Sequence, residues 1–200
     1  MDYMNQYDKN MPISNIAVYD LKESILASQY PMIVNIENRE LVENDFTRVN
    51  KLVKASKQNG SHGQFLTGIR VNFDLTFSNK AWVEAERYRF LEFVSSQSTM
   101  HRISKFDISS QCNEYVEKEI IDIVERLKQE YLSNPSESAY LKLLYNIPSG
   151  FKLTARVTTN YRCLLNIYAQ RYNHRLPEWQ NFCKQLLDLP YFKEFVENYV

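Results

Sequence analysis

The stretch IRVNFDLTF, residues 69 to 77, alternates apolar and polar side chains without interruption. Its apolar members are Ile69, Val71, Phe73, Leu75 and Phe77. A period of two places these side chains on one face of a β-strand and the intervening polar ones on the other. The pattern therefore predicts a strand with one buried face and one solvated face.

A second alternating stretch, FKLTARVTT at residues 151–159, predicts another strand. Around these two strands, apolar residues recur at spacings of three and four, which favours helices. The predicted helices cover residues 16–30, 45–57, 79–93, 112–132, 135–146, 159–172 and 176–189, with a short one after Pro190. The mixture predicts one domain of helices and strands together.

Several helix ends have recognisable signals. Asn59 and Gly60 predict a left-handed residue that ends a helix, and Ser78 or Asn79 predicts a cap that begins one. Asn134 followed by Pro135 predicts another helix start. The predicted buried side of the 112–132 helix consists of Val116, Ile120, Ile123, Val124, Leu127 and Tyr131.

The chain of 200 residues is long enough for one domain with a real core. Residues 1–12 are polar and end in Pro12, so we expect an N-terminal arm followed by a single domain over residues 13–200. We find no internal repeat and no low-complexity linker that would divide it. The 44% of hydrophobic residues argues against intrinsic disorder.

The charges balance, with 24 basic and 24 acidic residues. No net field therefore draws the chain to nucleic acid or to an anionic membrane, and any anion site must be local. The N-terminus lacks a leader pattern, and no apolar run is long enough for a membrane span. Three cysteines without a CxxC pair predict reduced thiols. We therefore expect a cytoplasmic protein.

Common catalytic signatures are missing from the sequence. His62, His101 and His174 are too scattered to form a zinc signature. There is no GxGxxG, no P-loop and no nucleophile elbow, and no cysteine stands beside a base at a recognisable spacing. Covalent catalysis by a side chain therefore has little support.

Arginines are the strongest candidates for a site. Arg87 and Arg89 lie two positions apart, which is ~200° on a helix, so they reach one ligand only if the helix ends there. The alternative is that each pairs locally with a neighbouring glutamate on the surface. Further along, Arg162 and Arg171 are predicted to project from opposite faces of one helix, whereas Asn160 and Arg171 share a face.

Three motifs, spread over roughly residues 45 to 185, resemble those of the flavin-dependent thymidylate synthase family. ERYRFLEFVSSQS, residues 86–98, is similar to the family's RHR motif followed by a serine. His62 in SHG stands 25 residues before Arg87, as the family's histidine does. NYRCLLNIYAQR, residues 160–171, has the family's Asn-x-Arg-x8-Arg spacing.

The resemblance implies an α+β fold in which helices pack on a small antiparallel sheet, as in thymidylate synthase-complementing proteins, assembled as a homotetramer. It implies FAD as cofactor, with NADPH and methylenetetrahydrofolate as co-substrates and a pyrimidine deoxynucleotide as substrate. The implied flavin-binding residues are His62, Arg87, Arg89, Asn160 and Arg162. The implied substrate-binding residues are Glu84, Ser98 and Arg171. No protein nucleophile is expected, because the reduced flavin supplies the hydride.

The chain also departs from the family's pattern. Tyr88 replaces the histidine of RHR, Glu84 replaces a glutamine, and one extra residue lies between Arg89 and Val94. The family's Asn-Glu appears as Ser95-Ser96, and two family arginines are replaced by Met100 and Leu144. Arg70, Arg102 or Arg156 are the candidates to replace those arginines.

These departures keep three interpretations open. The first is an active, divergent enzyme, in which Glu84 could accept a hydrogen bond from an exocyclic amino group of an altered base. The second is an inactive descendant that retains the scaffold for binding a nucleotide or a protein. The third is an unrelated mixed domain whose arginines pair on the surface.

Overall fold

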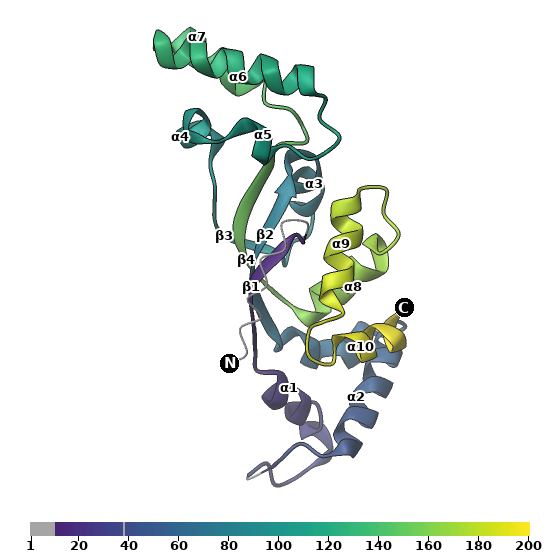
Figure 1. Ribbon diagram of the computed structural model, residues 1–200. Coiled ribbons are helices and arrows are strands. Elements are labelled where there is room, and N and C mark those ends of the chain that lie inside the picture. Colours follow the sequence, from purple (N-terminus) through teal and green to yellow (C-terminus); the bar gives the residue numbers. More distant parts are fainter. Residues whose placement is uncertain (1–10, 38) are drawn as a thin grey trace.

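The strand predicted at residues 69–77 is the long inner strand β2 (Arg70–Ser78) of a four-stranded antiparallel sheet (Figure 1). The computed structural model describes residues 11–37 and 39–200. The sheet has the order β1-β2-β4-β3, and its other strands are β1 (Ile13–Tyr19), β3 (Glu92–Ser96) and β4 (Lys152–Asn160). The predicted α+β fold with a small antiparallel sheet is confirmed.

The period of two in β2 sorts its side chains as predicted. Val71, Phe73, Leu75 and Phe77 are all buried, and the polar residues between them are not. β4 pairs with β2 along its whole length, for example Phe73 with Val157, and it too buries alternate residues. The two inner strands therefore present one continuous apolar face.

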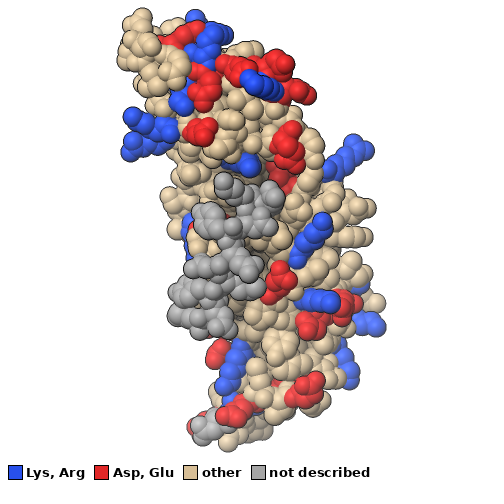
Figure 2. Space-filling view, in the orientation of Figure 1, with Lys and Arg blue, Asp and Glu red and all other residues tan. Residues whose placement is uncertain are grey.

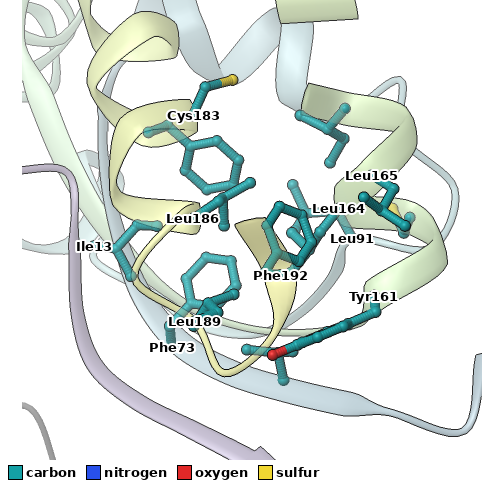
Figure 3. Close-up of a cluster of buried hydrophobic side chains, with 14 of the residues drawn as sticks. Ile13, Phe73, Leu91, Tyr161, Leu164, Leu165, Cys183, Leu186, Leu189 and Phe192 are labelled. Carbon is teal, nitrogen blue, oxygen red and sulfur yellow. The ribbon is translucent and has the colours of Figure 1, made fainter. Parts of the chain in front are cut away.

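Helices cover that face on one side, as Figure 1 shows for α8 (Tyr161–Arg171) and α9 (Pro177–Leu186). Phe73 packs on Phe182 of α9 at 6.0 Å between ring centroids, and Phe77 packs on Trp179 at 4.8 Å. The same core takes in α1 (Leu21–Ala27), α2 (Glu43–Ser56) and α10 (Phe192–Tyr199). Figure 3 shows how side chains from the sheet, α8, α9 and the C-terminal segment meet in it.

A second, smaller core lies at the other end of the sheet. It is built by α6 (Lys118–Ser133), α7 (Glu137–Tyr145) and the short α5 (Ile108–Gln111), which lie together at the top of Figure 1. Its buried residues are Ile103, Ile108, Val124, Leu127, Leu143 and Phe151. Short α4 (Thr99–Arg102) and the 3-10 turn η3 (Ile103–Lys105) connect β3 to this core.

Two predicted helices were partly wrong, because some of their residues belong to β1 and β3, the outer strands of the sheet. Residues 16–30 form the end of β1 and then α1, separated by Asp20 in the left-handed region with φ 58°. Residues 79–93 form α3 (Asn79–Ala85), a turn, and the start of β3. In both places, backbone pairing to a distant strand outweighs the local helical spacing.

Some predicted details of helix ends and faces were also wrong. Asn59 has φ −133° and caps the 3-10 helix η2 (Gly60–Thr67) instead of ending α2 in a left-handed turn. α7 is capped by Ser136, not Asn134. On α6, Ile120 and Ile123 remain 42% and 45% exposed, since the small core contacts only the side that carries Val124 and Leu127.

Both edge strands contain one extra residue. From Ser14 to Ala17 β1 advances three residues while its partner β2 moves two, from Asp74 to Asn72. From Phe93 to Ser95 β3 advances two while β4 moves one, from Val157 to Arg156. Each edge of the sheet therefore has a bulge.

Residues 1–10 of the predicted N-terminal arm lie outside the described residues. At the end of that arm, the Thr76 N–H donates to the Pro12 carbonyl at 2.8 Å, so the chain is already attached to the sheet before β1 begins. No helix in residues 11–37 and 39–200 combines the length and the apolar character needed to cross a membrane.

Candidate functional site

The predicted flavin residues His62 and Arg162 come from two elements that lie against each other, η2 and α8. Arg162 Nη1 donates to Gln64 Oε1 of η2 at 3.1 Å. A Cβ built on Gly60 would lie 2.6 Å from Arg162 Nη2, so the guanidinium lies directly against the backbone at Gly60. His62 is exposed on the same η2 segment. One polar surface thus joins the two sequence motifs.

Asn160, also predicted to bind flavin, has a clear local role. It is 6% exposed, and its Oδ1 accepts the Cys163 N–H at 2.9 Å as the N-cap of α8. The cap begins α8 immediately after β4 ends, because it satisfies a donor of the first helical turn. Arg162 therefore leaves the helix from its first turn, at a fixed position beside η2.

Arg87 and Arg89 lie in the turn between α3 and β3, which we call the arginine turn (Glu86–Leu91). Both side chains are exposed, and neither forms an ion pair with any described residue. The condition set by the sequence, that the helix must end for both to reach one ligand, is met because α3 ends at Ala85. The predicted alternative of local pairing with glutamates is not found among the described residues.

Two predicted substrate residues, Glu84 and Arg171, form an ion pair with each other. Arg171 Nη1 donates to Glu84 Oε2 at 2.6 Å, and His174 Nε2 lies 3.1 Å from the same oxygen. The three side chains are only 15 to 21% exposed. The Arg171 guanidinium also lies over the Trp179 ring, 5.0 Å from its centroid. Arg171 is therefore already engaged inside the chain.

Tyr88 closes this cluster from the arginine turn. Its hydroxyl accepts from Arg171 Nε at 2.8 Å and donates to Gln170 Oε1 at 3.0 Å. Sequence reasoning missed the contacts of Tyr88 and His174. The spacing of three between Arg171 and His174 is a usable signal for a contact, whereas nothing in the sequence indicates that Tyr88 reaches α8.

The remaining predicted residues are spread over the sheet and the smaller core. Ser98 is the residue before α4 and is partly buried, and its carbonyl accepts from the Arg102 N–H at 3.0 Å. Of the possible replacement arginines, Arg70 and Arg102 are exposed and form no ion pair with described residues. Arg156 is engaged, because its Nη1 contacts Asp74 Oδ1 at 3.2 Å and the Asn15 carbonyl at 2.7 Å.

The thiols are poor nucleophiles. Burial raises the pKa of Cys163, and it raises the pKa of Cys183 to about 12 despite the nearby charge of Arg171. Burial also raises the pKa of Cys112, against a lowering effect of Lys152. Thiolate, the reactive form, is therefore scarce at all three positions near neutral pH. In the part of the chain that is described, no cluster of three His, Cys, Asp or Glu residues could hold a metal ion.

Among the described residues, the predicted site residues make contacts in two different places. Arg162 contacts η2, while Arg171 contacts α3 and the arginine turn, as their opposite positions on α8 predicted. A hollow of about 890 Å³ lies by β1 and β2 and is lined in part by Asp74, Thr76, Gln97, Lys152 and Glu178, but by none of the predicted residues. Figure 2 shows basic and acidic side chains interspersed over one face of the molecule.

The fold defines the class of protein that this chain resembles. It is the fold of the flavin-dependent thymidylate synthases, as the sequence motifs had indicated. A thymidylate synthase of this type from Helicobacter pylori, solved with FAD and dUMP, superposes with a TM-score of 0.71 at 17% identity, covering 90% of this chain and 94% of that one.

The same fold occurs in a methylase that acts on UMP and dUMP. The UMP/dUMP methylase PolB from Streptomyces cacaoi, solved with 5-Br dUMP, superposes with a TM-score of 0.68 at 14% identity, covering 94% of this chain and 93% of that one. No protein-family model and no curated protein sequence matches the chain.

Proposed function

We propose that this chain is a flavin-dependent enzyme that transfers a one-carbon unit from methylenetetrahydrofolate to a pyrimidine deoxynucleotide, either dUMP or a nucleotide with a related base. Two solved proteins of the same fold support this substrate class, one carrying FAD and dUMP and the other a dUMP analogue. Bound FAD, reduced by NADPH, would supply the hydride for this chemistry.

The observation that carries the proposal is the state of the three arginines assigned to flavin. Arg87, Arg89 and Arg162 make no ion pair with described residues, and Arg162 is held only by the neutral amide of Gln64. A guanidinium without a carboxylate partner has an uncompensated charge, and its paired N–H donors are free to bind a phosphate. This donor set fits the pyrophosphate of FAD, so the residues present suit the cofactor.

The other assignments follow from position. His62 lies exposed on η2 beside Arg162, and Asn160 fixes the start of the helix that carries Arg162. We assign the nucleotide to Ser98, Glu84 and Arg171. A base with an exocyclic amino group would suit the carboxylate of Glu84 better than uracil does, because a carboxylate only accepts hydrogen bonds. The buried thiols agree with a reaction that needs no protein nucleophile.

One observation favours a second candidate function. Arg171 is bonded to Glu84 and contacts His174 and Tyr88, so a nucleotide would have to compete with these partners. The second candidate is an inactive descendant, which would bind a nucleotide or a protein without catalysing a reaction. Binding and turnover must therefore be measured separately.

The binding experiment is a titration of purified protein into FAD, followed by the quenching of flavin fluorescence. We expect Arg87→Ala, Arg89→Ala and Arg162→Ala each to weaken FAD binding about tenfold or more, which corresponds to about 1.4 kcal/mol per lost charged hydrogen bond. The matched control is Arg126→Ala, because Arg126 is an exposed arginine on α6 whose partner is Glu130. Absence of FAD binding, or equal weakening by Arg126→Ala, would contradict the proposal.

The turnover experiment is release of tritium from C5 of labelled dUMP or dCMP in the presence of FAD, NADPH and methylenetetrahydrofolate. Release supports the enzyme. FAD binding without release from either nucleotide supports the inactive descendant.

A further inference from the structure

The arginine turn is attached to the body of the protein through Tyr88, the residue between its two arginines. Tyr88 is partly buried, while Arg87 and Arg89 on either side are exposed. Its ring lies edge-on to buried Trp179 of α9, 5.9 Å between centroids. The Arg171 guanidinium lies over the Tyr88 ring, 5.6 Å from its centroid.

The hydroxyl of Tyr88 adds directional bonds to this packing. It is the acceptor for Arg171 Nε and the donor to Gln170 Oε1, both at the C-terminal end of α8. Arg171 is in turn fixed by Glu84 of α3, at 2.6 Å. A single chain of contacts thus joins α3, the arginine turn, α8 and α9, and its members hold one another in place.

The backbone of the turn is braced at the same residue. The Tyr88 N–H donates to the Ala85 carbonyl at 3.0 Å, and the Tyr88 carbonyl accepts from the Leu91 N–H at 3.0 Å. Leu91 is 3% exposed and closes the turn on the core. Because Tyr88 is held inward on both its backbone and its side chain, its two neighbours are directed away from the core.

We propose that Tyr88 is a positioning residue: its hydroxyl bond to Arg171 holds the arginine turn in the conformation that presents Arg87 and Arg89 together to an anionic ligand. The identification of that ligand as FAD rests on the proposed function above. In this arrangement the ion pair of Arg171 with Glu84 also anchors the turn, in addition to its assigned contact with the nucleotide.

The first test needs no cofactor. Trypsin cleaves after arginine, and the Arg89–Phe90 bond reports how often the turn opens. Tyr88→Phe removes the hydroxyl and retains the ring, so we expect cleavage at Arg89 to accelerate about tenfold with little change in the melting temperature. Two comparisons serve as controls: cleavage at exposed Arg102, and the variant Tyr145→Phe, whose tyrosine is 81% exposed on α7. We expect Tyr88→Phe to leave the rate of cleavage at Arg102 unchanged, and Tyr145→Phe to leave the rate of cleavage at Arg89 unchanged. An unaltered rate at Arg89 would overturn the proposal.

The second test links the turn to the ligand through a double-mutant cycle on FAD affinity. We expect Tyr88→Phe to weaken FAD binding about fivefold in the native chain, and to have no further effect when Arg87 and Arg89 are both alanine. Effects that act through a shared element do not add. A purely structural role would weaken binding equally in both backgrounds, and would overturn the proposal.

The outcomes separate this inference from the proposed function. Faster cleavage at Arg89 in a protein that binds no FAD would refute the flavin assignment and support the anchoring of the turn. Faster cleavage together with unchanged FAD affinity would refute the positioning role itself.

Discussion

At the residue scale, the arginine side chains of the candidate site occur in two different environments. Arg171 has its charge balanced by Glu84 at 2.6 Å in a half-buried position, whereas Arg87 and Arg89 face solvent without a carboxylate. Partners at short range in a partly buried site interact strongly, since water screens them less. The family spacing alone treats these arginines alike, and only their neighbours distinguish them.

Asp45 shows the strongest case of a buried carboxylate held by arginines. It is 2% exposed and contacts Arg48 and, at 3.6 Å, Arg39, while it accepts the Val42 N–H at 3.1 Å. Burial acts to raise the pKa of Asp45, but the bonds from Arg48 and Val42 and the charges of both arginines outweigh burial and lower it. The ionised form is therefore the one that stabilises the fold.

We predict that Asp45→Asn lowers the free energy of unfolding by about 2 kcal/mol at pH 7, because it leaves half-buried guanidiniums without their partner. A pKa that is lowered on folding contributes stability above the unfolded value of about 4, and that contribution is lost as pH falls through the lowered folded value. The difference between the native chain and Asp45→Asn should therefore shrink below about pH 4.

The measurement is urea unfolding of both proteins between pH 7 and pH 3. Asp122→Asn is the control, since Asp122 pairs with Lys118 on the exposed side of α6 and should change little. A difference that persists unchanged at pH 3 would be inconsistent with this account.

At the scale of elements, the inner strands were predictable and the edge strands were not. β2 and β4 bury alternate residues, so their sequences alternate. All five residues of β3 are exposed, so its sequence does not alternate between apolar and polar residues. The helical spacing of the preceding residues therefore made the predicted helix extend to residue 93. β1 likewise buries only Ile13, and its strand conformation depends on pairing with a distant segment.

The candidate site likewise has one part that the sequence indicates and one part that it does not. The sequence selects Arg162 and His62 as candidates because they belong to motifs, and the elements that carry them, η2 and α8, do lie together. The contact between Glu84 and Arg171 spans 87 residues and depends on how α3 and α8 pack on the sheet. No local pattern encodes it.

The start of α8 permits a test that separates structure from binding at Asn160. We predict that Asn160→Ala lowers the free energy of unfolding by about 1 kcal/mol, because the helix loses its cap, and that Asn160→Asp retains stability since aspartate caps equally well. Asn166→Ala, on the exposed side of α8, is the control. Chemical unfolding measures all three.

The aspartate variant then addresses the cofactor. If Asn160 lies beside FAD, a new negative charge there should weaken FAD binding while the fold remains intact. Unchanged affinity would assign Asn160 to the cap alone.

At the scale of the whole molecule, one chain presents its candidate residues in two separate places. Arg162 and His62 lie at η2, and Tyr88 of the arginine turn contacts Arg171 at the C-terminal end of α8. We propose that assembly into a homotetramer brings the two surfaces of different copies together. The hollow beside β1 and β2 contains none of them.

We therefore predict a solution mass of four times 23.8 kDa by light scattering. If the site is shared between copies, dilution that dissociates the assembly should also abolish FAD binding. A monomer that binds FAD with full affinity would contradict the shared site.

The bulges at the two edges of the sheet limit how such an assembly can form. A regular outer strand offers a row of free amide and carbonyl groups on which a neighbouring sheet can continue, and this is the usual route to fibrous aggregation. Here the extra residue in β1, between Ser14 and Ala17, and the one in β3, between Phe93 and Ser95, interrupt both rows. If copies of the chain assemble, we therefore expect them to recognise one another through side-chain surfaces and not by continuing the sheet at these edges.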